Sequence, residues 1–122
     1  MSIKGRILMR KIWKLGLEWD QKVPKEINNE MKVLTKDMEM IPELSFPRQA
    51  INEDLKYGLH IFCDSSTEAY GFVMYACDDT SNNSFLFAKS KLAPLKKGQE
   101  YSVPTLELMG VILALKCLPT LM

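Results

Sequence analysis

Two acidic residues, Asp64 and Glu107, occupy positions from which carboxylates can do chemistry. Asp64 ends the alternating segment 57–64, which is typical of a β-strand, and a short polar loop follows it. Glu107 is the only acidic residue in the apolar run 104–118. A strand-end aspartate and a helical glutamate can converge at one edge of a sheet, where their oxygens can hold a hard divalent cation. Two such cations, about 4 Å apart, can clamp the attacking and leaving oxygens of a phosphodiester. We therefore expect the two acids to lie side by side.

Each acid alone also has a purely structural explanation. Asp64 can cap the turn formed by residues 65–68 through its side-chain oxygens, as aspartate often does after a strand. Glu107 lies one turn into its helix, where the helix dipole stabilises a carboxylate that is partly exposed to water. A carboxylate on an apolar helix otherwise needs a partner, a metal or access to solvent. Neither residue by itself establishes a site, and the prediction rests on the pair.

Basic residues form a second candidate site on the third predicted strand and the loop after it. Its members are Lys89, Lys91, Lys96 and Lys97. Several lysines on one face can follow the phosphates of a nucleic acid without reading its sequence. The alternative is that they keep an edge strand soluble, and the absence of interleaved aromatic residues favours that alternative.

The elements that must position these residues fall into two regions. Apolar residues recur at helical spacing over 3–15, where Gly16 is a plausible stop, and again from Pro24 to Pro42. Residues 42–54 look extended, and we place a domain boundary near residue 50. The remainder changes period, with predicted strands over 57–64, 71–77 and 85–91 joined by short loops, and then a helix over 104–118 that Ser102 can cap.

This order predicts an α+β fold with two N-terminal helices followed by a β-β-β-α unit. Short loops between consecutive strands indicate an antiparallel meander. The last helix is apolar almost all round, so we expect it to be covered on more than one side. Nothing follows Met122 in the sequence, so the chain looks cut in the middle of a fold.

Composition limits the classes of partner and compartment. The net charge of +1 indicates neither a nucleic-acid-binding nor a membrane-binding chain as a whole. The apolar run 106–118 is too short to span a bilayer, so no membrane partner is expected. The three cysteines, Cys63, Cys77 and Cys117, have no metal-site spacing and are expected to be buried, reduced thiols. With no secretory signal, they point to an intracellular, reducing compartment, without distinguishing cytoplasm from nucleus.

Three ordered motifs carry a resemblance to a known family. They read HIFCDSSTEAYGFVMY, AKSKLAPLK and VPTLELMGVILALKCL. Together they resemble the start of the RNase H-like domain of Pao (BEL/Pao) retrotransposon polyproteins, a region that is also labelled Pao retrotransposon peptidase. The earlier stretch GRILMRKIWKLGLEWDQKVPKEI resembles the segment that joins reverse transcriptase to that domain. The resemblance implies a helical connection segment over 1–50 and the N-terminal half of an RNase H-like domain over 51–122.

The resemblance also implies roles for the two acids. Asp64 matches the first catalytic aspartate of such domains, and Glu107 matches the catalytic glutamate of the helix. The complete domain would use Mg²⁺ or Mn²⁺ to hydrolyse the RNA strand of an RNA–DNA hybrid by two-metal catalysis. Here Thr105 stands where the family motif has arginine, and about two of four expected metal ligands are missing. We therefore expect this chain to bind no metal tightly and to be inactive by itself, as a truncated RNase H-like unit.

Two other functions remain open from the sequence. The chain can be a non-catalytic, element-derived module that binds a partner or nucleic acid, or that self-associates through a bare strand edge beside the first strand. It can also be an aspartic peptidase, whose motif is Asp-Thr/Ser-Gly. The nearest approach to that motif is Asp64-Ser65-Ser66, in which a serine replaces the glycine that lets the turn close.

Overall fold

The structure is a computed structural model of the chain. It describes residues 2–46, 51, 56–95, 98 and 100–120. The chain divides into two compact units, residues 1–45 and 46–122, and each is described here by itself. The residues around the expected boundary at position 50 lie outside the described part of the chain, so the division into 1–50 and 51–122 stays a prediction.

The first unit contains two helices, α1 (Ile3–Lys14) and α2 (Lys25–Glu39), and a short 3-10 turn, Ile41–Glu43. Ser2 caps α1, because its hydroxyl accepts a hydrogen bond from the Gly5 N–H at 3.2 Å. After α1, Gly16 has a φ of +59°, a left-handed conformation that glycine adopts without steric cost, which explains why the helix ends there. The predicted ends of α1 are within one residue of the observed ones, whereas α2 ends at Glu39, three residues before Pro42.

The two helices contact each other along one side. Gly5 and Leu8 are the buried residues of α1. An ion pair between Lys11 and Glu30, with Nζ and Oε2 3.2 Å apart, joins the helices at the surface. Exposed pairs of this kind contribute only about 0–1 kcal/mol, so apolar contact is the main source of cohesion here.

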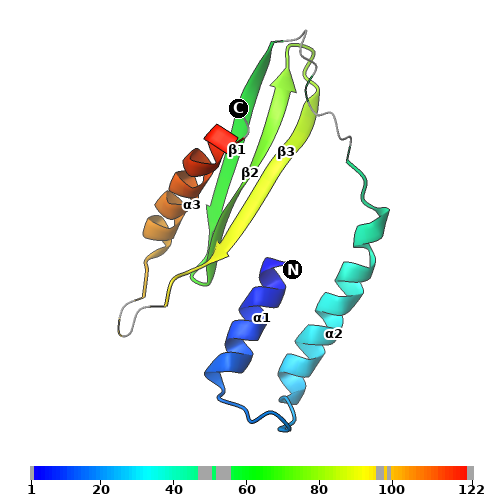
Figure 1. Cartoon of the computed structure of the whole chain (residues 1–122), viewed down its shortest axis with the longest axis vertical. Coiled ribbons are helices and arrows are strands. Elements are labelled where there is room, and N and C mark those ends of the chain that lie inside the picture. Colours follow the sequence, from blue (N-terminus) through cyan, green and yellow to red (C-terminus); the bar gives the residue numbers. More distant parts are fainter. Residues whose placement is uncertain (1, 47–50, 52–55, 96–97, 99, 121–122) are drawn as a thin grey trace. The chain divides into compact units, whose positions relative to one another are not determined.

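The second unit is a three-stranded antiparallel sheet with a helix on one face (Figure 1). Its strands are β1 (Tyr57–Ser65), β2 (Ala69–Asp78) and β3 (Asn83–Leu92), in the order β1-β2-β3. Helix α3 (Val103–Cys117) contacts β1 and β2 and continues into a 3-10 turn, Leu118–Thr120. Ser102 caps it, accepting from the Thr105 N–H at 3.4 Å. The predicted α+β class and the meander are confirmed.

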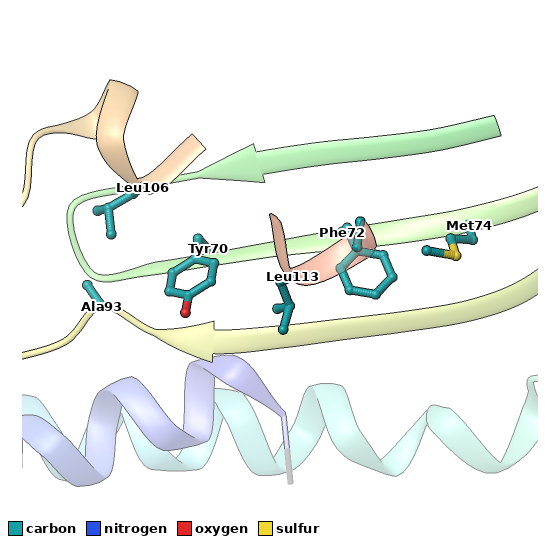
Figure 2. Packing of buried hydrophobic residues seen from close by; sticks show 7 residues of the cluster. Tyr70, Phe72, Met74, Ala93, Leu106 and Leu113 are labelled. Carbon is teal, nitrogen blue, oxygen red and sulfur yellow. The ribbon is translucent and has the colours of Figure 1, made fainter. Parts of the chain in front are cut away.

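The core lies between α3 and the sheet. Alternate residues of β2 are buried on the helix-covered face, and one stripe of α3 meets them (Figure 2). Met74 and Leu106 are fully buried in this core. Fully burying side chains of this size is worth about 1.5–3 kcal/mol each. The period-two burial of β2 therefore identifies the face that α3 covers.

Aromatic rings line the opposite, open face of the sheet. Phe62, Tyr75 and Phe85 come from β1, β2 and β3, and their neighbouring ring centroids are 6.2 Å and 6.0 Å apart in edge-on geometry. Phe46 extends the row, with its centroid 5.1 Å from that of Phe85. A β-bulge opposite Met74 and Tyr75 lets Phe85 join the row. Aromatic pairs of this kind stabilise neighbouring strands.

Helix α3 packs closely against the sheet because the helix residue that faces the sheet is a glycine, Gly110. A Cβ atom at Gly110 would lie 3.3 Å from the Gly71 carbonyl oxygen and 3.6 Å from the Cys63 Cβ. The first of these distances is tighter than ordinary van der Waals contact, so a longer side chain would push α3 away from β1 and β2. Gly110 therefore sets the depth at which the helix packs.

By length and composition alone, Val103–Thr120 could cross a membrane. This stretch is longer than the run 106–118 on which the sequence argument against a membrane helix relied, so length no longer excludes one. Core helices of soluble proteins have the same properties, and here the buried stripe of α3 packs against the sheet. The absence of a membrane partner stays a prediction.

The turn between β2 and β3 is organised by the Asp78 carboxylate. Its Oδ1 accepts hydrogen bonds from the Thr80 hydroxyl at 2.6 Å, the Thr80 N–H at 2.9 Å and the Asn82 N–H at 3.0 Å. These bonds, the one from the Thr80 hydroxyl first, hold the pKa of Asp78 below its usual value. The carboxylate thus pairs the backbone N–H groups of Thr80 and Asn82. Ser81, between them, has a φ of 64°, in the left-handed region.

We expect Gly110→Leu to destabilise the sheet unit by about 1–3 kcal/mol, the usual cost of overpacking. Leucine favours helix, so a loss would report the contact with the sheet and not helix propensity. The matched control is Gly58→Leu on β1, where an added Cβ meets nothing within 4 Å. Chemical unfolding followed by circular dichroism measures both. Equal stability of the two variants would contradict the packing argument.

The stability of the sheet unit should fall in acid partly through Asp78. A lowered pKa in the folded state means that the carboxylate stabilises the fold above its unfolded pKa, about 3.9. That contribution is lost as the pH falls through the lower, folded pKa. The difference between the unfolding midpoints at neutral and at acid pH should therefore be smaller in Asp78→Ala than in the parent chain. Asp79→Ala, beside it in the turn, is the matched control for the removal of one carboxylate.

Candidate carboxylate site and lysine edge

Asp64 is the penultimate residue of β1 and lies directly opposite Gly71 on β2. Its neighbours, Cys63 and Ser65, belong to the face that α3 covers, since Cys63 packs against the core and Ser65 bonds to α3. Because side chains alternate along a strand, Asp64 belongs to the open face, together with Phe62. Its side chain is exposed.

The turn after β1 is held mainly by Ser66. The Ser66 hydroxyl accepts from the backbone N–H groups of Glu68 and Ala69 at 3.2 and 3.3 Å, and the Ser66 N–H donates to the Ala69 carbonyl at 2.8 Å. Asp64 contributes one short-range bond, from the Ser65 N–H to its Oδ1 at 2.8 Å. The turn-capping role considered for Asp64 is thus largely taken by Ser66, and Oδ2 accepts no hydrogen bond from any described residue.

Glu107 is the fifth residue of α3 and is exposed, although the preceding Leu106 is fully buried. Helical geometry places it on the same flank as Gly110, three residues later, and Ala114, seven residues later. A Cβ atom at Gly110 would lie 3.3 Å from the Gly71 carbonyl oxygen on β2 and 3.6 Å from the Cys63 Cβ on β1, so this flank of α3 lies toward these two strands. Within the described residues, no hydrogen bond or ion pair engages the Glu107 carboxylate.

Two contacts bring the end of β1 and the start of α3 to the same corner of the unit. The Ser65 hydroxyl donates to the Val103 carbonyl oxygen at 3.3 Å, and a Cβ at Gly110 would lie 3.6 Å from that of Cys63. Asp64 lies between the two strand residues and Glu107 between the two helix residues. Their backbones are therefore neighbours, but strand alternation puts the Asp64 side chain on the open face. A cation bound by both carboxylates would have to lie at the free edge of β1, where both side chains could reach it.

The donor set of this corner fits Mg²⁺ or Mn²⁺ in kind, because carboxylate oxygens are the ligands these cations prefer. The number of carboxylates is too small for such a site. Nowhere in the described part of the chain do three or more histidine, cysteine, aspartate or glutamate side chains gather as a metal cluster. No metal-dependent step can be derived from two separated carboxylates, so the assignment of Asp64 and Glu107 as metal ligands stays a prediction.

The three cysteines are free thiols and are half-buried. Burial raises the pKa of Cys63 by desolvation, which disfavours the thiolate and therefore its use as a nucleophile or metal ligand. The expectation of reduced thiols that fill space is consistent with these positions, although none of the three is fully buried.

Lys89 and Lys91 are exposed on β3. Their partners across the sheet are Phe72 and Tyr70, so both lysines belong to the face that α3 covers, beyond the part that α3 contacts. They face one way, as predicted. Lys96 and Lys97 lie outside the described residues. One strand, β2, separates these lysines from Asp64, so the basic and acidic candidates occupy opposite edges of the sheet.

Two features of this unit are not evident from residue types and spacing. Ser65 and Ser66 look equivalent in sequence, but the Ser65 hydroxyl bonds to α3 and the Ser66 hydroxyl closes the turn. The aromatic row depends on strand register and on the bulge. Alternation along each predicted strand was the one available signal for it, and alternation does not say which rings face each other.

Comparison with known proteins gives one match. Residues 1–122 match the model of a family described as Pao retrotransposon-like RNaseH-like domain. No curated protein and no solved structure gives a significant match. The match covers both structural units and agrees with the three motifs and with the β-β-β-α order of the second unit. The chain therefore belongs to the Pao retrotransposon-like RNaseH-like domain family.

Proposed function

We propose that this chain is part of a retrotransposon Pol polyprotein and derives from a nuclease domain that hydrolyses the RNA strand of RNA–DNA hybrids. Asp64 and Glu107 would be two of its catalytic, cation-binding carboxylates. The observation that carries the proposal is the pair of contacts that place the end of β1 beside the first turns of α3. Both carboxylates are exposed there, and neither forms an ion pair with a described residue.

We propose that the isolated chain does not cleave a hybrid. Two-metal hydrolysis requires carboxylates on several sides of the cations, and this corner supplies two, which approach from opposite faces of β1. The catalytic role therefore belongs to a more complete set of ligands than the described residues form. The Cys63 thiol, next to Asp64 in the sequence, is a poor substitute for a missing ligand, because burial raises its pKa and disfavours the thiolate.

Lys89 and Lys91 are proposed to contact the phosphates of the hybrid. An RNase H-like family suggests nucleic-acid binding in general, and exposed lysines on one face provide sequence-independent attraction to phosphates. Their position on an edge strand equally suits the role of preventing strand addition, so they serve both purposes without conflict.

A second candidate function is non-catalytic association through the edge of β1. The two outer strands differ in their protection. β3 carries Lys89 and Lys91 and a bulge, whereas β1 has no charged residue from Tyr57 to Cys63 apart from the titratable His60. Long, uncharged edge strands are templates for pairing with another chain. We propose a second copy of this chain as the partner at this edge.

The remaining alternatives are less well supported by the geometry. The peptidase motif would need a glycine where Ser66 closes the turn with three hydrogen bonds, so we do not propose proteolysis. The three free thiols agree with an intracellular, reducing compartment, which we propose as the location.

Purified chain should show no metal-dependent cleavage of a fluorescently labelled RNA–DNA hybrid in Mg²⁺ or Mn²⁺. The reason is the incomplete carboxylate set. A complete RNase H enzyme assayed on the same substrate controls for substrate quality. Cleavage that depends on metal and disappears in Asp64→Asn would overturn the proposed inactivity and would establish Asp64 as catalytic.

Self-association should increase with protein concentration and should weaken when a permanent charge is placed on the β1 edge. His60→Lys introduces that charge at an exposed position, because lysine on an edge strand opposes pairing with another chain. Ala88→Lys adds the same charge to β3, which already carries two lysines, and should leave association unchanged. Sedimentation over a range of concentrations measures both. A monomer at all concentrations would rule out the β1 interface.

A further inference from the structure

The side of α3 that the sheet does not cover is apolar, although a helix side that faces water is normally polar. Four large apolar residues on this side are 60%, 42%, 42% and 55% exposed, namely Leu108, Val111, Ile112 and Leu115. Their spacing of three and four residues places them together on one side of the helix. Within the described part of the chain, α3 therefore has an apolar side without a partner.

Helix α3 lies at the β1 side of the sheet. It contacts the edge strand β1 and the central strand β2, and it lies away from β3 (Figure 1). Neighbouring strands are about 4.8 Å apart, and a helix with its side chains is about 10 Å wide, so α3 reaches past the outer edge of β1. The unpaired backbone edge of β1 and one flank of α3 are therefore continuous parts of the same surface.

The flank of α3 nearest to this edge can be identified from Gly110. A Cβ atom at Gly110 would lie 3.6 Å from the Cys63 Cβ on β1, whereas Leu113 belongs to the core cluster that includes alternate residues of β2. Successive helix residues are rotated by about 100°, so residues 110–113 pass around the outer side of α3. Val111 therefore borders the β1 flank, and Ile112 borders the opposite flank.

The sequence of β1 is compatible with antiparallel pairing to a second copy of itself. In the register that overlaps the whole strand, Ile61 lies opposite Ile61 of the second copy, and Asp64 lies opposite Gly58. No charged residue then faces a like charge. Phe62, which is 59% exposed at the end of the aromatic row, would lie opposite His60 and diagonal to the other Phe62. The aromatic row would thus continue into the second copy.

This pairing also determines where the two α3 helices lie. Two identical edge strands pair in antiparallel fashion about a two-fold axis perpendicular to the sheet, so both helices lie on the same face of the combined sheet. With α3 above β1 and β2, the two helix axes are about two strand spacings apart, which is about 10 Å. Packed helices have axes about 8–10 Å apart. Pairing at β1 therefore brings the two α3 helices into contact.

We propose that the β1 edge and the Val111 flank of α3 form one interface with a second copy of this chain, in which β1 pairs with β1 and α3 packs against α3. The proposal rests on the self-association proposed above for the β1 edge and adds a helix contact to it. Nucleic acid suits this surface less well, because Tyr57–Cys63 and Leu108–Leu115 contain no lysine or arginine. A lipid surface would cover α3 alone and leave the β1 backbone groups unpaired.

Sedimentation of the full chain over a range of concentrations tests the helix contact. Val111→Lys should raise the dimer dissociation constant by at least about tenfold, because each copy brings an unpaired ammonium into an apolar contact. Val111→Thr, which keeps the shape of the side chain, should weaken association in the same direction. Ile112→Lys is the matched control, since Ile112 has the same 42% exposure, and it should change the constant by less than about threefold.

Two further measurements accompany the sedimentation series. Circular dichroism should show that both lysine variants keep their helices, because lysine is a better helix former than valine or isoleucine. Amide hydrogen exchange within β1 should slow as the concentration of the parent chain rises, because pairing protects the N–H groups of the edge strand. Val111→Lys should reduce this concentration dependence, and Ile112→Lys should retain it.

The variants separate this proposal from the one on which it rests. Weaker association in both His60→Lys and Val111→Lys supports the joint interface. An effect of His60→Lys alone would overturn the helix contact and leave association at the β1 edge intact. An effect of Val111→Lys alone, or equal effects of Val111→Lys and Ile112→Lys, would overturn the joint interface.

Two results would exclude a second copy as the partner of this surface. A monomer at all concentrations would remove both the helix contact and the β1 association. A monomer that binds vesicles of anionic lipid, and loses that binding in Val111→Lys and Ile112→Lys alike, would identify the apolar side of α3 as a membrane-surface site. The outcome of the hybrid-cleavage assay affects neither reading.

Discussion

The close approach of α3 to the sheet is the contact on which the second unit depends. Gly110 presents no side chain, so the helix can settle against the Gly71 carbonyl and the Cys63 side chain. That depth allows Leu106 and Leu113 to enter one core cluster with Tyr70, Phe72 and Met74 (Figure 2). It also fixes where the helix begins relative to the end of β1, because the Ser65 hydroxyl then reaches the Val103 carbonyl. The arrangement of the candidate site is thus a consequence of core packing.

The same packing leaves the sheet with two different faces and two different edges. One face is covered by α3, while the other carries the row of Phe62, Tyr75 and Phe85 and, near its end, Asp64. The edge at β3 is protected by lysines and a bulge, and the edge at β1 is not. Asp64 and Glu107, which we propose as catalytic acids of this member of an RNase H-like family, lie near one end of β1. The free edge of β1 lies beside that end.

Charged residues are distributed differently in the two units. In the sheet unit, Asp64 on β1 and the two lysines of β3, Lys89 and Lys91, lie on opposite edges. In the helical unit, charge is concentrated, because α1 has basic residues without acidic ones and α2 has an excess of acids. A small net charge for the chain therefore conceals a helix, α1, with five basic residues and no acidic one. Attraction to a polyanion depends on such local density within about a Debye length, and not on the total.

Local patterns in the sequence determined the elements and their order. Gly16 and the caps Ser2 and Ser102 mark the limits of helices, and alternation from residue 57 onward marks strands, because backbone preferences and side-chain periods act over a few residues. Only the tertiary structure decided the rest. Which of Ser65 and Ser66 fastens α3, how Phe85 joins Tyr75 across a bulge, and on which face of β1 Asp64 lies relative to Glu107 all depend on register and helix depth. These are set by packing between residues distant in sequence, where a shift of one residue exchanges the faces of a strand.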